Sequence, residues 1–469
     1  MSDDSHCKRE GDSISRRNFV KVGGATLAGG ALLGPGATPA TVRGGTGLFP
    51  YRPRQDARIQ RHRMLGRTGW SASDIGMGSV PLRETAVVRY AYDKGVNYFD
   101  TAEGYGNGAA ERAIGDAMQH MDRNKIFIAT KGRVNAEDSA ATIVERVRHS
   151  LERLQTDYVD AYSIHAVGSV EALSHSGYHA AIAQLKAEGR VRFTGVSYHG
   201  PGDPQGPSMG DVLTAAAEDG RFDIILLVYN FMNHEESDRI IAACKANNVG
   251  TTAMKTAPGL LRYQPLDPDN LTEQQERYVE RFTSRGQSRE AALQRLEAQT
   301  QRQKDLYDRT RPFVERYGLQ TEEQLRLGSI HWVIQNPDMH TACIAFTNFD
   351  LVDKVIPLSG TELGSAELRM LQECRLALND QYCRHGCAEC RGSCPHDVPV
   401  STIMRYAYYY EGQGREKAAM SLYSDLRGSD ASACHNCAGD CSGACPYGID
   451  ILPKMLQVHD LLTLTSTLS

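Results

Sequence analysis

The sequence predicts an α/β protein in which a (β/α)8 TIM barrel precedes a small helical segment rich in cysteine. Short apolar runs alternate with amphipathic helical stretches, and eight such strand candidates follow one another along the chain. Eight of the 12 cysteines fall between residues 383 and 445, which separates the end of the chain from the barrel. A doubly wound open sheet is the alternative, but no GxGxxG motif follows a strand in the first unit.

The overall composition is that of an ordinary globular protein. The chain has 469 residues, of which 41% are hydrophobic and 23% charged, and its formal net charge is -5. This length suits two or three domains, or one large barrel with a small companion. The charge gives no sign of nucleic-acid binding. No run of eighteen apolar residues occurs, so the sequence predicts no stable membrane span.

The N-terminus has the pattern of a targeting segment. Residues 15–21 read SRRNFVK, and a Gly- and Ala-rich, weakly apolar stretch follows them, with a predicted cut near Ala40. This arrangement resembles a twin-arginine export signal, a route used by proteins that leave the cytoplasm already folded, often with a cofactor. We therefore assign 1–45 to signal and linker and expect a periplasmic protein. A disordered basic tail is the alternative.

The expected barrel covers residues 60–365. Its helical patterns include 140–154 and 180–189, and its last helix is expected at 321–337. The strand candidates, each an apolar run bounded by turn residues, are 74–78, 97–101, 125–131, 158–165, 192–197, 222–230, 250–256 and 341–346.

A long charged insertion at 262–320 interrupts the repeat after the seventh strand. Its pattern is helical, and because it follows a barrel strand, it is expected to rise from the face where the active site of such a barrel lies. Two interpretations remain open: a solvated helical hairpin, and a lid or partner-docking element.

Polar residues at three successive strand ends form the candidate catalytic site. Asp100 ends the second strand, Lys131 the third and His165 the fourth, while Tyr105 follows Asp100 after a short turn. Strands of a parallel barrel end at the same face, so these side chains are expected to converge. Each residue alone has a structural explanation, as a helix cap, a loop anchor, a solvated lysine or a core histidine.

The four residue types suit carbonyl reduction. Tyrosine has a pKa of about 10, and a nearby ammonium favours the phenolate and lowers that pKa. A carboxylate beside the lysine keeps it charged and in place. A histidine can orient the substrate oxygen by a hydrogen bond.

Six segments between residues 64 and 357 resemble the aldo–keto reductases. They are LGRTGWSASDIGMGSV, KGVNYFDTAEGYGNGAAERAIGDAM, IFIATKG, DYVDAYSIH, GRVRFTGVSYHG and SIHWVIQNP. The resemblance implies a (β/α)8 barrel that exchanges hydride between a nicotinamide cofactor and an aldehyde, ketone or alcohol. It implies that Tyr105 is the general acid, that Lys131 tunes it, that Asp100 holds the lysine and that His165 orients the carbonyl.

The same resemblance implies a cofactor site for NADP(H) or NAD(H). Gly78 and Ser79 match the end of the first strand beside the nicotinamide ribose, and Ser197 matches a serine near the carboxamide. Lys255, at the end of the seventh strand, completes the candidate cofactor residues.

The sequence departs from the family pattern at several cofactor positions. Tyr198 stands where many members have asparagine, Leu227 aligns with a glutamine on the sixth strand, and Met254 with a stacking tyrosine. The segment 344–350 after the eighth strand lacks the Arg or Lys that an NADP 2′-phosphate favours.

Two cysteine groups follow the barrel, each ending in C-x3-C-P. This ending and the close spacing resemble bacterial ferredoxins and favour two [4Fe-4S] clusters, each with three cysteines from one group and one from the other. Zinc, which usually uses two separated pairs, and disulfides are the alternatives. The predicted ligands are Cys383, Cys387, Cys390 and Cys394 in the first group and Cys434, Cys437, Cys441 and Cys445 in the second.

The segment 370–460 is therefore expected to be a ferredoxin-like iron–sulfur domain. Residues 398–428 between the cysteine groups are helical in pattern, and the tyrosines at 406–410 are expected in its core rather than in an electron path. We predict an exported oxidoreductase whose clusters exchange electrons with a redox partner protein. The alternative is an electron-transfer or partner-binding protein that uses the barrel as a scaffold without NAD(P)H.

Overall fold

The computed structural model describes residues 54–463, except 81, 83, 201–205, 261–262, 285, 320–321 and 427. The predicted twin-arginine signal at 1–45 lies outside the described residues. The described residues all belong to one compact unit, Thr46–Ser469. Among them no helix combines the length and the apolar character needed to cross a membrane.

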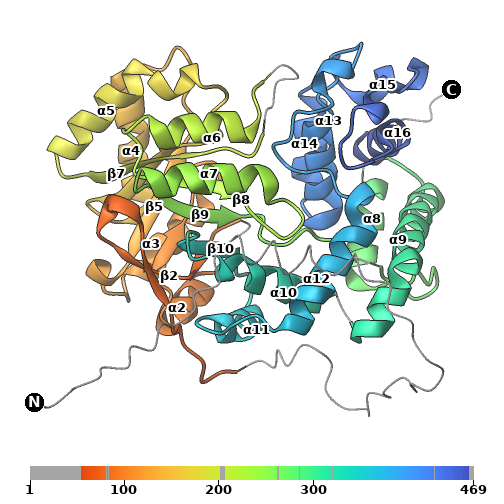
Figure 1. Ribbon diagram of the computed structural model, residues 1–469, viewed down its shortest axis with the longest axis horizontal. Coiled ribbons are helices and arrows are strands. Elements are labelled where there is room, and N and C mark those ends of the chain that lie inside the picture. The colour runs from red at the N-terminus through yellow and green to blue at the C-terminus, as the bar shows by residue number, and fades with distance from the viewer. Residues whose placement is uncertain are drawn as a thin grey trace, which may run out of the picture. The chain divides into compact units, whose positions relative to one another are not determined.

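Within the described residues, eight parallel strands close into a barrel in the order β10-β3-β4-β5-β6-β7-β8-β9, which confirms the predicted (β/α)8 barrel (Figure 1). Every predicted strand overlaps an observed one. The strands are β3 Ile75–Gly78, β4 Tyr98–Asp100, β5 Phe127–Gly132, β6 Val159–Ile164, β7 Val191–Ser197, β8 Ile224–Val228, β9 Gly250–Met254 and β10 Thr341–Ala345.

Helices surround the barrel and alternate with its strands. In α4, Ser139 caps the first turn by accepting a hydrogen bond from the Thr142 amide, and apolar residues three and four apart face the strands, as the sequence predicts. The helices are α2 Thr85–Asp93, α3 Ala109–Met118, α4 Ala140–Leu154, α5 Ser176–Ala187, α6 Met209–Glu218, α7 Glu235–Ala246, α10 Glu322–Gln335 and α11 Phe349–Val355.

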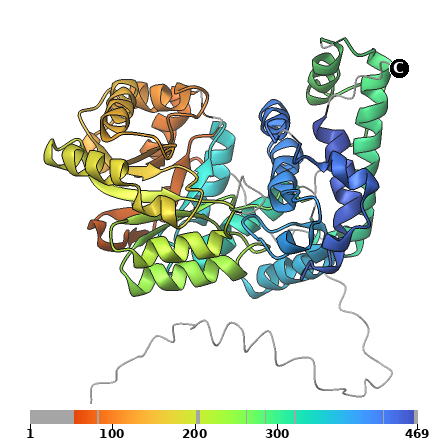
Figure 2. The same ribbon diagram turned by 90° about the horizontal axis from the view of Figure 1, so that it is seen from above.

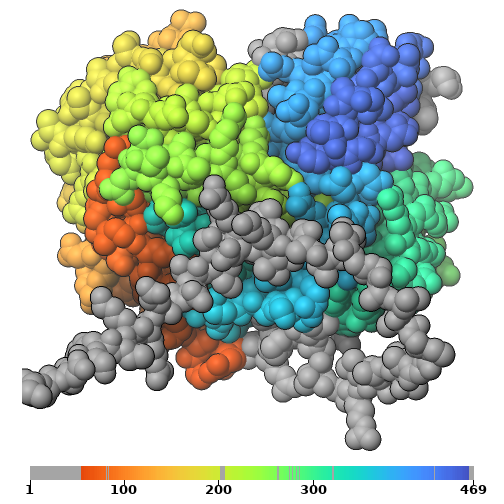
Figure 3. Space-filling view, in the orientation of Figure 1, coloured from red at the N-terminus to blue at the C-terminus, as the bar shows by residue number. Residues whose placement is uncertain are grey.

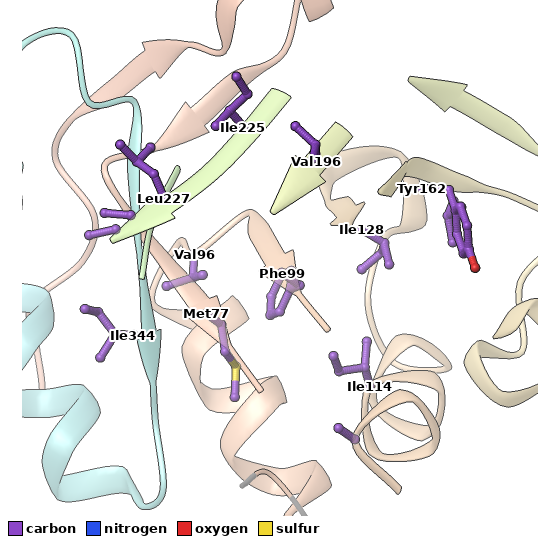
Figure 4. Close-up of a cluster of buried hydrophobic side chains, with 14 of the residues drawn as sticks. Met77, Val96, Phe99, Ile114, Ile128, Tyr162, Val196, Ile225, Leu227 and Ile344 are labelled. Carbon is purple, nitrogen blue, oxygen red and sulfur yellow. The ribbon is translucent and has the colours of Figure 1, made fainter. Parts of the chain in front are cut away.

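The main hydrophobic core lies between the strands and these helices. Outward-facing strand residues such as Met77, Phe99 and Ile128 meet helix residues such as Ile114 in this layer (Figure 4). Since the helices bury one side of every strand, the barrel can present polar side chains only at strand ends.

A short antiparallel hairpin, which the sequence did not predict, closes the amino-terminal end of the barrel. It pairs β1 His62–Met64 with β2 Ser71–Ser73. Leu65 packs there against Tyr98 and Phe127, the first residues of β4 and β5, and the Trp70 ring lies 6.0 Å from that of Phe127. The carboxyl end of the barrel is therefore the end left for a functional site.

The insertion forms two helices, α8 Glu273–Thr283 and the long α9 Arg289–Tyr317, as its pattern predicts. Their apolar residues, including Phe282 and Leu296, share a hydrophobic core with Ile403 and Met455 of the C-terminal segment. In Figure 2 the green α9 lies alongside the blue C-terminal helices. The insertion is thus no free solvated hairpin, because it docks onto another part of the same chain.

The C-terminal segment is helical and packs against the barrel. In Figure 3 its blue surface meets the lime-green surface of α6 and α7, where the Met209 amide donates to the Gly386 carbonyl over 3.0 Å and Arg375 pairs with Glu235. A π-helical turn at Tyr408–Gly412 follows α13. Its helices are α12 Ser365–Leu378, α13 Val400–Ala407, α14 Glu416–Ser424, α15 Asp440–Gly443 and α16 Ile451–Leu462.

Candidate active site

The structure brings the four predicted catalytic residues together at the carboxyl end of the barrel. Asp100 is the last residue of β4, Lys131 lies in β5, and His165 follows β6 directly. The Lys131 ammonium donates to both carboxylate oxygens of Asp100 over 2.7 Å and to the Thr101 carbonyl over 2.8 Å. Lys131 and Asp100 are 2% and 7% exposed, so this is a buried ion pair.

Tyr105 lies above the ion pair and beside His165. The Lys131 ammonium is 5.3 Å from the centroid of the Tyr105 ring. The Tyr105 and His165 rings meet edge to face, with centroids 5.6 Å apart and planes at 85°. A carbonyl oxygen placed between the phenol and the imidazole could therefore interact with both.

The charge states at this site follow from burial and from the lysine. Burial raises the pKa of Tyr105 above its usual value, although Lys131 acts in the opposite direction. Lys131 thus acts on this pKa in the predicted direction, but burial outweighs it, and the phenol keeps its proton. Burial and Lys131 lower the pKa of His165 to about 3, so its imidazole is neutral.

The lysine remains charged in this buried setting. Burial works against its charge, but Asp100 and Tyr105 together outweigh that effect and raise the pKa of Lys131. A neutral phenol, a neutral imidazole and an ammonium are thus present together, which is the set needed for proton donation to a carbonyl.

Ser197 braces the turn that presents His165. Its hydroxyl accepts from the Ala166 amide over 3.1 Å and donates to the Ile164 carbonyl over 3.4 Å. Ala166 has a φ of 54°, a left-handed conformation that needs such support. The serine predicted beside the cofactor therefore also holds the catalytic turn.

Gly78 and Ser79 lie at the end of the first barrel strand, next to the ion pair. Gly78 pairs with Asp100 in the register of β3 and β4. Ser79 is 1% exposed, and its hydroxyl has no hydrogen-bond partner among the described residues. A buried hydroxyl without a protein partner is a candidate contact for a ligand.

Lys255 follows β9 in a left-handed conformation, with a φ of 50°. The Asn230 side chain supports it by donating to the Lys255 carbonyl over 2.8 Å. The ammonium of Lys255 lies 5.5 Å from the centroid of the Tyr409 ring. This predicted cofactor residue is thus also in contact with the C-terminal segment.

The C-terminal segment contributes residues to the barrel mouth that the sequence analysis missed. Arg405 donates to the His199 carbonyl over 2.9 Å, and the Tyr408 hydroxyl donates to the Ala257 carbonyl over 3.0 Å. Tyr409 and Arg415 lie close enough to affect the pKa of Tyr105. The signal was the pair of arginines that flank the tyrosine run. The tyrosines themselves lie in the C-terminal core as predicted, where Tyr406, Tyr409 and Tyr410 are buried.

Two of the departures from the family pattern have structural explanations. Leu227 shares the helix-facing core layer with Ile225, so it does not point into the barrel mouth and cannot replace the glutamine (Figure 4). Tyr198 is 1% exposed, and its hydroxyl donates to the Pro207 carbonyl over 3.0 Å.

One set of thiols mixes the two cysteine groups. Burial, and then the neighbouring thiols Cys387, Cys390 and Cys445, raise the pKa of Cys383. The same four cysteines line a small apolar cavity. We call Cys383, Cys387, Cys390 and Cys445 thiol set one.

The remaining four cysteines form thiol set two. Burial, and then Cys394, Cys441 and Cys437, raise the pKa of Cys434 to about 11. All eight cysteines are free thiols. Each set therefore contains three cysteines from one sequence group and one from the other.

The fold and the site define a barrel oxidoreductase. Residues 69–376 match the sequence model of the Aldo/keto reductase family, and this chain belongs to that family. An uncharacterised oxidoreductase of Bacillus subtilis is 28% identical over 47% of this chain and 72% of its own length. L-galactose dehydrogenase of Arabidopsis thaliana is 32% identical over 43% of this chain and 67% of its own length.

A solved structure is also similar. The holo form of an aldo-keto reductase from Bacillus halodurans aligns with a TM-score of 0.48 and 22% identity, over 67% of this chain and 95% of that one.

The lowered pKa values of two histidines predict that the protein loses stability in acid. His165 and His340 have pKa values lowered by burial to about 3 and about 4, against about 6.5 in the unfolded chain. Below about pH 6.5 the unfolded state therefore takes up protons that the folded state excludes, and stability falls with pH. We expect the free energy of unfolding to drop by up to about 2 kcal/mol per histidine between pH 7 and pH 5.

Denaturant titrations at the two pH values measure this drop. His165→Gln is expected to reduce it, and His120→Gln, at an exposed position, to leave it unchanged. A His165→Gln protein that loses stability with acid as steeply as the parent would contradict the prediction.

Proposed function

We propose that this protein exchanges hydride between a nicotinamide cofactor and a carbonyl or alcohol substrate, with Tyr105 as the proton donor and acceptor. The observation that carries the proposal is the buried Asp100–Lys131 pair beneath Tyr105, with a neutral His165 beside it. A bound nicotinamide would supply or accept the hydride at the substrate carbon.

In the direction of reduction, the phenol of Tyr105 gives its proton to the carbonyl oxygen. The Lys131 ammonium stabilises the phenolate that remains, and Asp100 keeps that ammonium charged and in place. The neutral His165 donates a hydrogen bond that orients the oxygen. In alcohol oxidation the same groups act in reverse.

The residues at the barrel mouth fit a nicotinamide cofactor. The unsatisfied hydroxyl of Ser79 and the side-chain-free Gly78 lie beside the ion pair. Ser197 and Lys255 lie at the ends of β7 and β9. The segment 344–350 carries no cation that could bind the 2′-phosphate of NADP(H), so the proposal includes both NADP(H) and NAD(H).

Replacement of the proposed acid tests this function. Tyr105→Phe removes the only proton-donating atom of this side chain, so we expect kcat for aldehyde reduction to fall about 100-fold to 10,000-fold. The assay follows NADPH and NADH oxidation with a panel of aldehydes and ketones. Tyr92→Phe, on the outer helix α2, serves as the control with unchanged kcat.

If wild-type protein turns over no carbonyl compound with either cofactor and Tyr105→Phe changes no redox activity, the proposal fails. Calorimetric titration with both cofactors then tests the scaffold alternative, for which no binding is expected.

We also propose that the eight cysteines bind two [4Fe-4S] clusters, one in each thiol set. Cluster ligation by four cysteines suits the composition of both sets. The Val398 amide donates to Cys394 Sγ over 3.3 Å and the Gly439 amide to Cys437 Sγ over 3.4 Å. Such bonds to sulfur tune iron–sulfur centres.

The sequence spacing of the cysteines favours clusters over zinc, because zinc sites usually use two separated pairs of ligands, whereas both groups here end in C-x3-C-P. Among the described residues, no group of three or more His, Cys, Asp or Glu side chains is placed to hold a single metal ion.

The mixed thiol sets give a sharp test of the clusters. Wild-type protein purified without oxygen should contain about eight iron atoms per chain. The double variant Cys383→Ser/Cys445→Ser removes two ligands of one set and should keep about half of this iron. Cys383→Ser/Cys394→Ser removes one ligand of each set, although both residues come from one sequence group, and should lose most of it.

Iron analysis and EPR of the dithionite-reduced proteins measure these outcomes. Zinc in place of iron, or equal iron in the two double variants, would contradict the proposal.

We further propose that the protein is exported by the twin-arginine route, since residues 15–21 read SRRNFVK. Arg16→Lys with Arg17→Lys is expected to leave most of the protein in the cytoplasm, whereas Arg9→Lys is expected to leave export unchanged. Cell fractionation and immunoblotting measure this, and periplasmic protein from the double-lysine variant would refute it.

A further inference from the structure

The C-terminal segment covers the mouth of the barrel, and we call the covering part the roof. Arg405 and Tyr408 hydrogen-bond to carbonyls of the loops after β7 and β9. The backbones at Gly200 of the barrel and Gly386 of the C-terminal segment also approach closely. A side chain at Gly200 would place its Cβ atom only 2.7 Å from the Gly386 Cα. A substrate at Tyr105 therefore lies between the barrel and this roof.

Tyr409 forms the centre of a cationic cluster in this roof. The Lys255 ammonium lies 5.5 Å from the centroid of its ring, and the guanidinium carbon of Arg415 lies 5.1 Å from the same centroid. Although burial opposes the effect, Lys255, Arg405 and Arg415 together lower the pKa of Tyr409. Three positive charges thus act on one side chain that is 7% exposed.

No carboxylate balances two of these charges. Among the described residues, neither Lys255 nor Arg415 forms an ion pair with Asp or Glu, whereas Lys131 in the same mouth is paired with Asp100. Burial lowers the pKa of Lys255, so keeping its charge there has a cost. An anionic ligand would supply the missing negative charge.

The cationic cluster lies at the same end of the barrel as the proposed catalytic residues. Lys255 directly follows β9, as His165 directly follows β6, and parallel strands end at one face. An anion held by the cluster would therefore lie at the mouth that holds the reacting carbonyl.

Two buried imidazoles beside the cluster also have nitrogens without partners. His385 is 2% exposed, and neither of its ring nitrogens has a hydrogen-bond partner among the described residues. The Nδ1 atom of His199 is likewise unsatisfied. Arg405 donates to the His199 carbonyl, and the His385 ring lies 4.7 Å from that of Tyr408, next to Tyr409 in the chain, so both rings lie beside the cluster. Buried polar atoms of this kind are normally satisfied by a ligand or water.

We propose that the barrel mouth takes a carbonyl substrate that carries a carboxylate, held by Lys255 and Arg415 with Tyr409 between them. This inference rests on the proposed function, because it names the substrate class of the Tyr105 site. A phosphate of a dinucleotide has the same oxyanion chemistry, so the experiment separates the two sources.

A matched pair of aldehydes tests the proposal by binding, without need for turnover. The probes are 4-carboxybenzaldehyde and its neutral methyl ester, titrated calorimetrically into the cluster-loaded, cofactor-saturated protein at pH 7. We expect the carboxylate to bind about tenfold to a hundredfold more tightly than the ester. Arg415→Gln and Lys255→Met should each remove most of that preference. Lys417→Gln, an exposed lysine on α14, is the matched control and should keep it.

Equal affinity for the two probes, no binding of either, or an unchanged preference in both variants would overturn the inference. Titration with NADPH supplies the other arm: if the variants weaken NADPH about tenfold but keep the carboxylate preference, the cations serve the cofactor phosphate and the inference is wrong. Turnover without carboxylate preference defeats this inference alone. Carboxylate preference without nicotinamide-linked turnover defeats the proposed function alone.

Discussion

The buried ion pair between Asp100 and Lys131 is the constraint on which the rest of the site depends. Two charges at 2% and 7% exposure are tolerated only because the carboxylate and a backbone carbonyl satisfy the ammonium. The pair joins adjacent strands and fixes a positive charge under Tyr105. Burial, and then that charge, keep His165 neutral, and the charge opposes the effect of burial on the phenol. The proposed proton donation by Tyr105 therefore depends on the barrel framework.

A second constraint comes from the contact between the barrel and the C-terminal segment. The loop between Cys383 and Cys387 contains His385 and Gly386, and Gly386 accepts a hydrogen bond from the first residue of α6. The His385 ring packs 4.7 Å from that of Tyr408, which reaches the loop after β9. The proposed cluster ligands and the roof of the active site therefore belong to one packed unit.

The sequence was informative where local pattern and topology determine position. Asp100, Lys131 and His165 could be placed because each was predicted at a strand end. Parallel strands end at one face, so the three positions together predicted one site. The hairpin of β1 and β2 was missed because its short strands lack apolar alternation. The positions of Tyr409 and Arg415 at the barrel mouth were missed because Tyr409, which contacts Arg415, reaches the mouth by contact with Lys255, far away in the chain. Leu227 was aligned with the glutamine on the sixth strand, but the alternation of side chains along the strand turns this position outward, toward the helices.

Closure of the mouth by a separate segment changes how substrate recognition can be built. A barrel alone offers only loop residues around Tyr105, and here the loop after β10 supplies no cation. The roof supplies Arg405 and Arg415 instead. Its helices pack against the insertion helix α8, whose Phe282 lies in the hydrophobic core that they share. The long insertion thus stabilises the element that carries the positive charge. The proposed recognition thus combines Lys255 of the barrel with Arg415 of the C-terminal segment, whereas the proposed proton transfer depends on the ion pair beneath Tyr105.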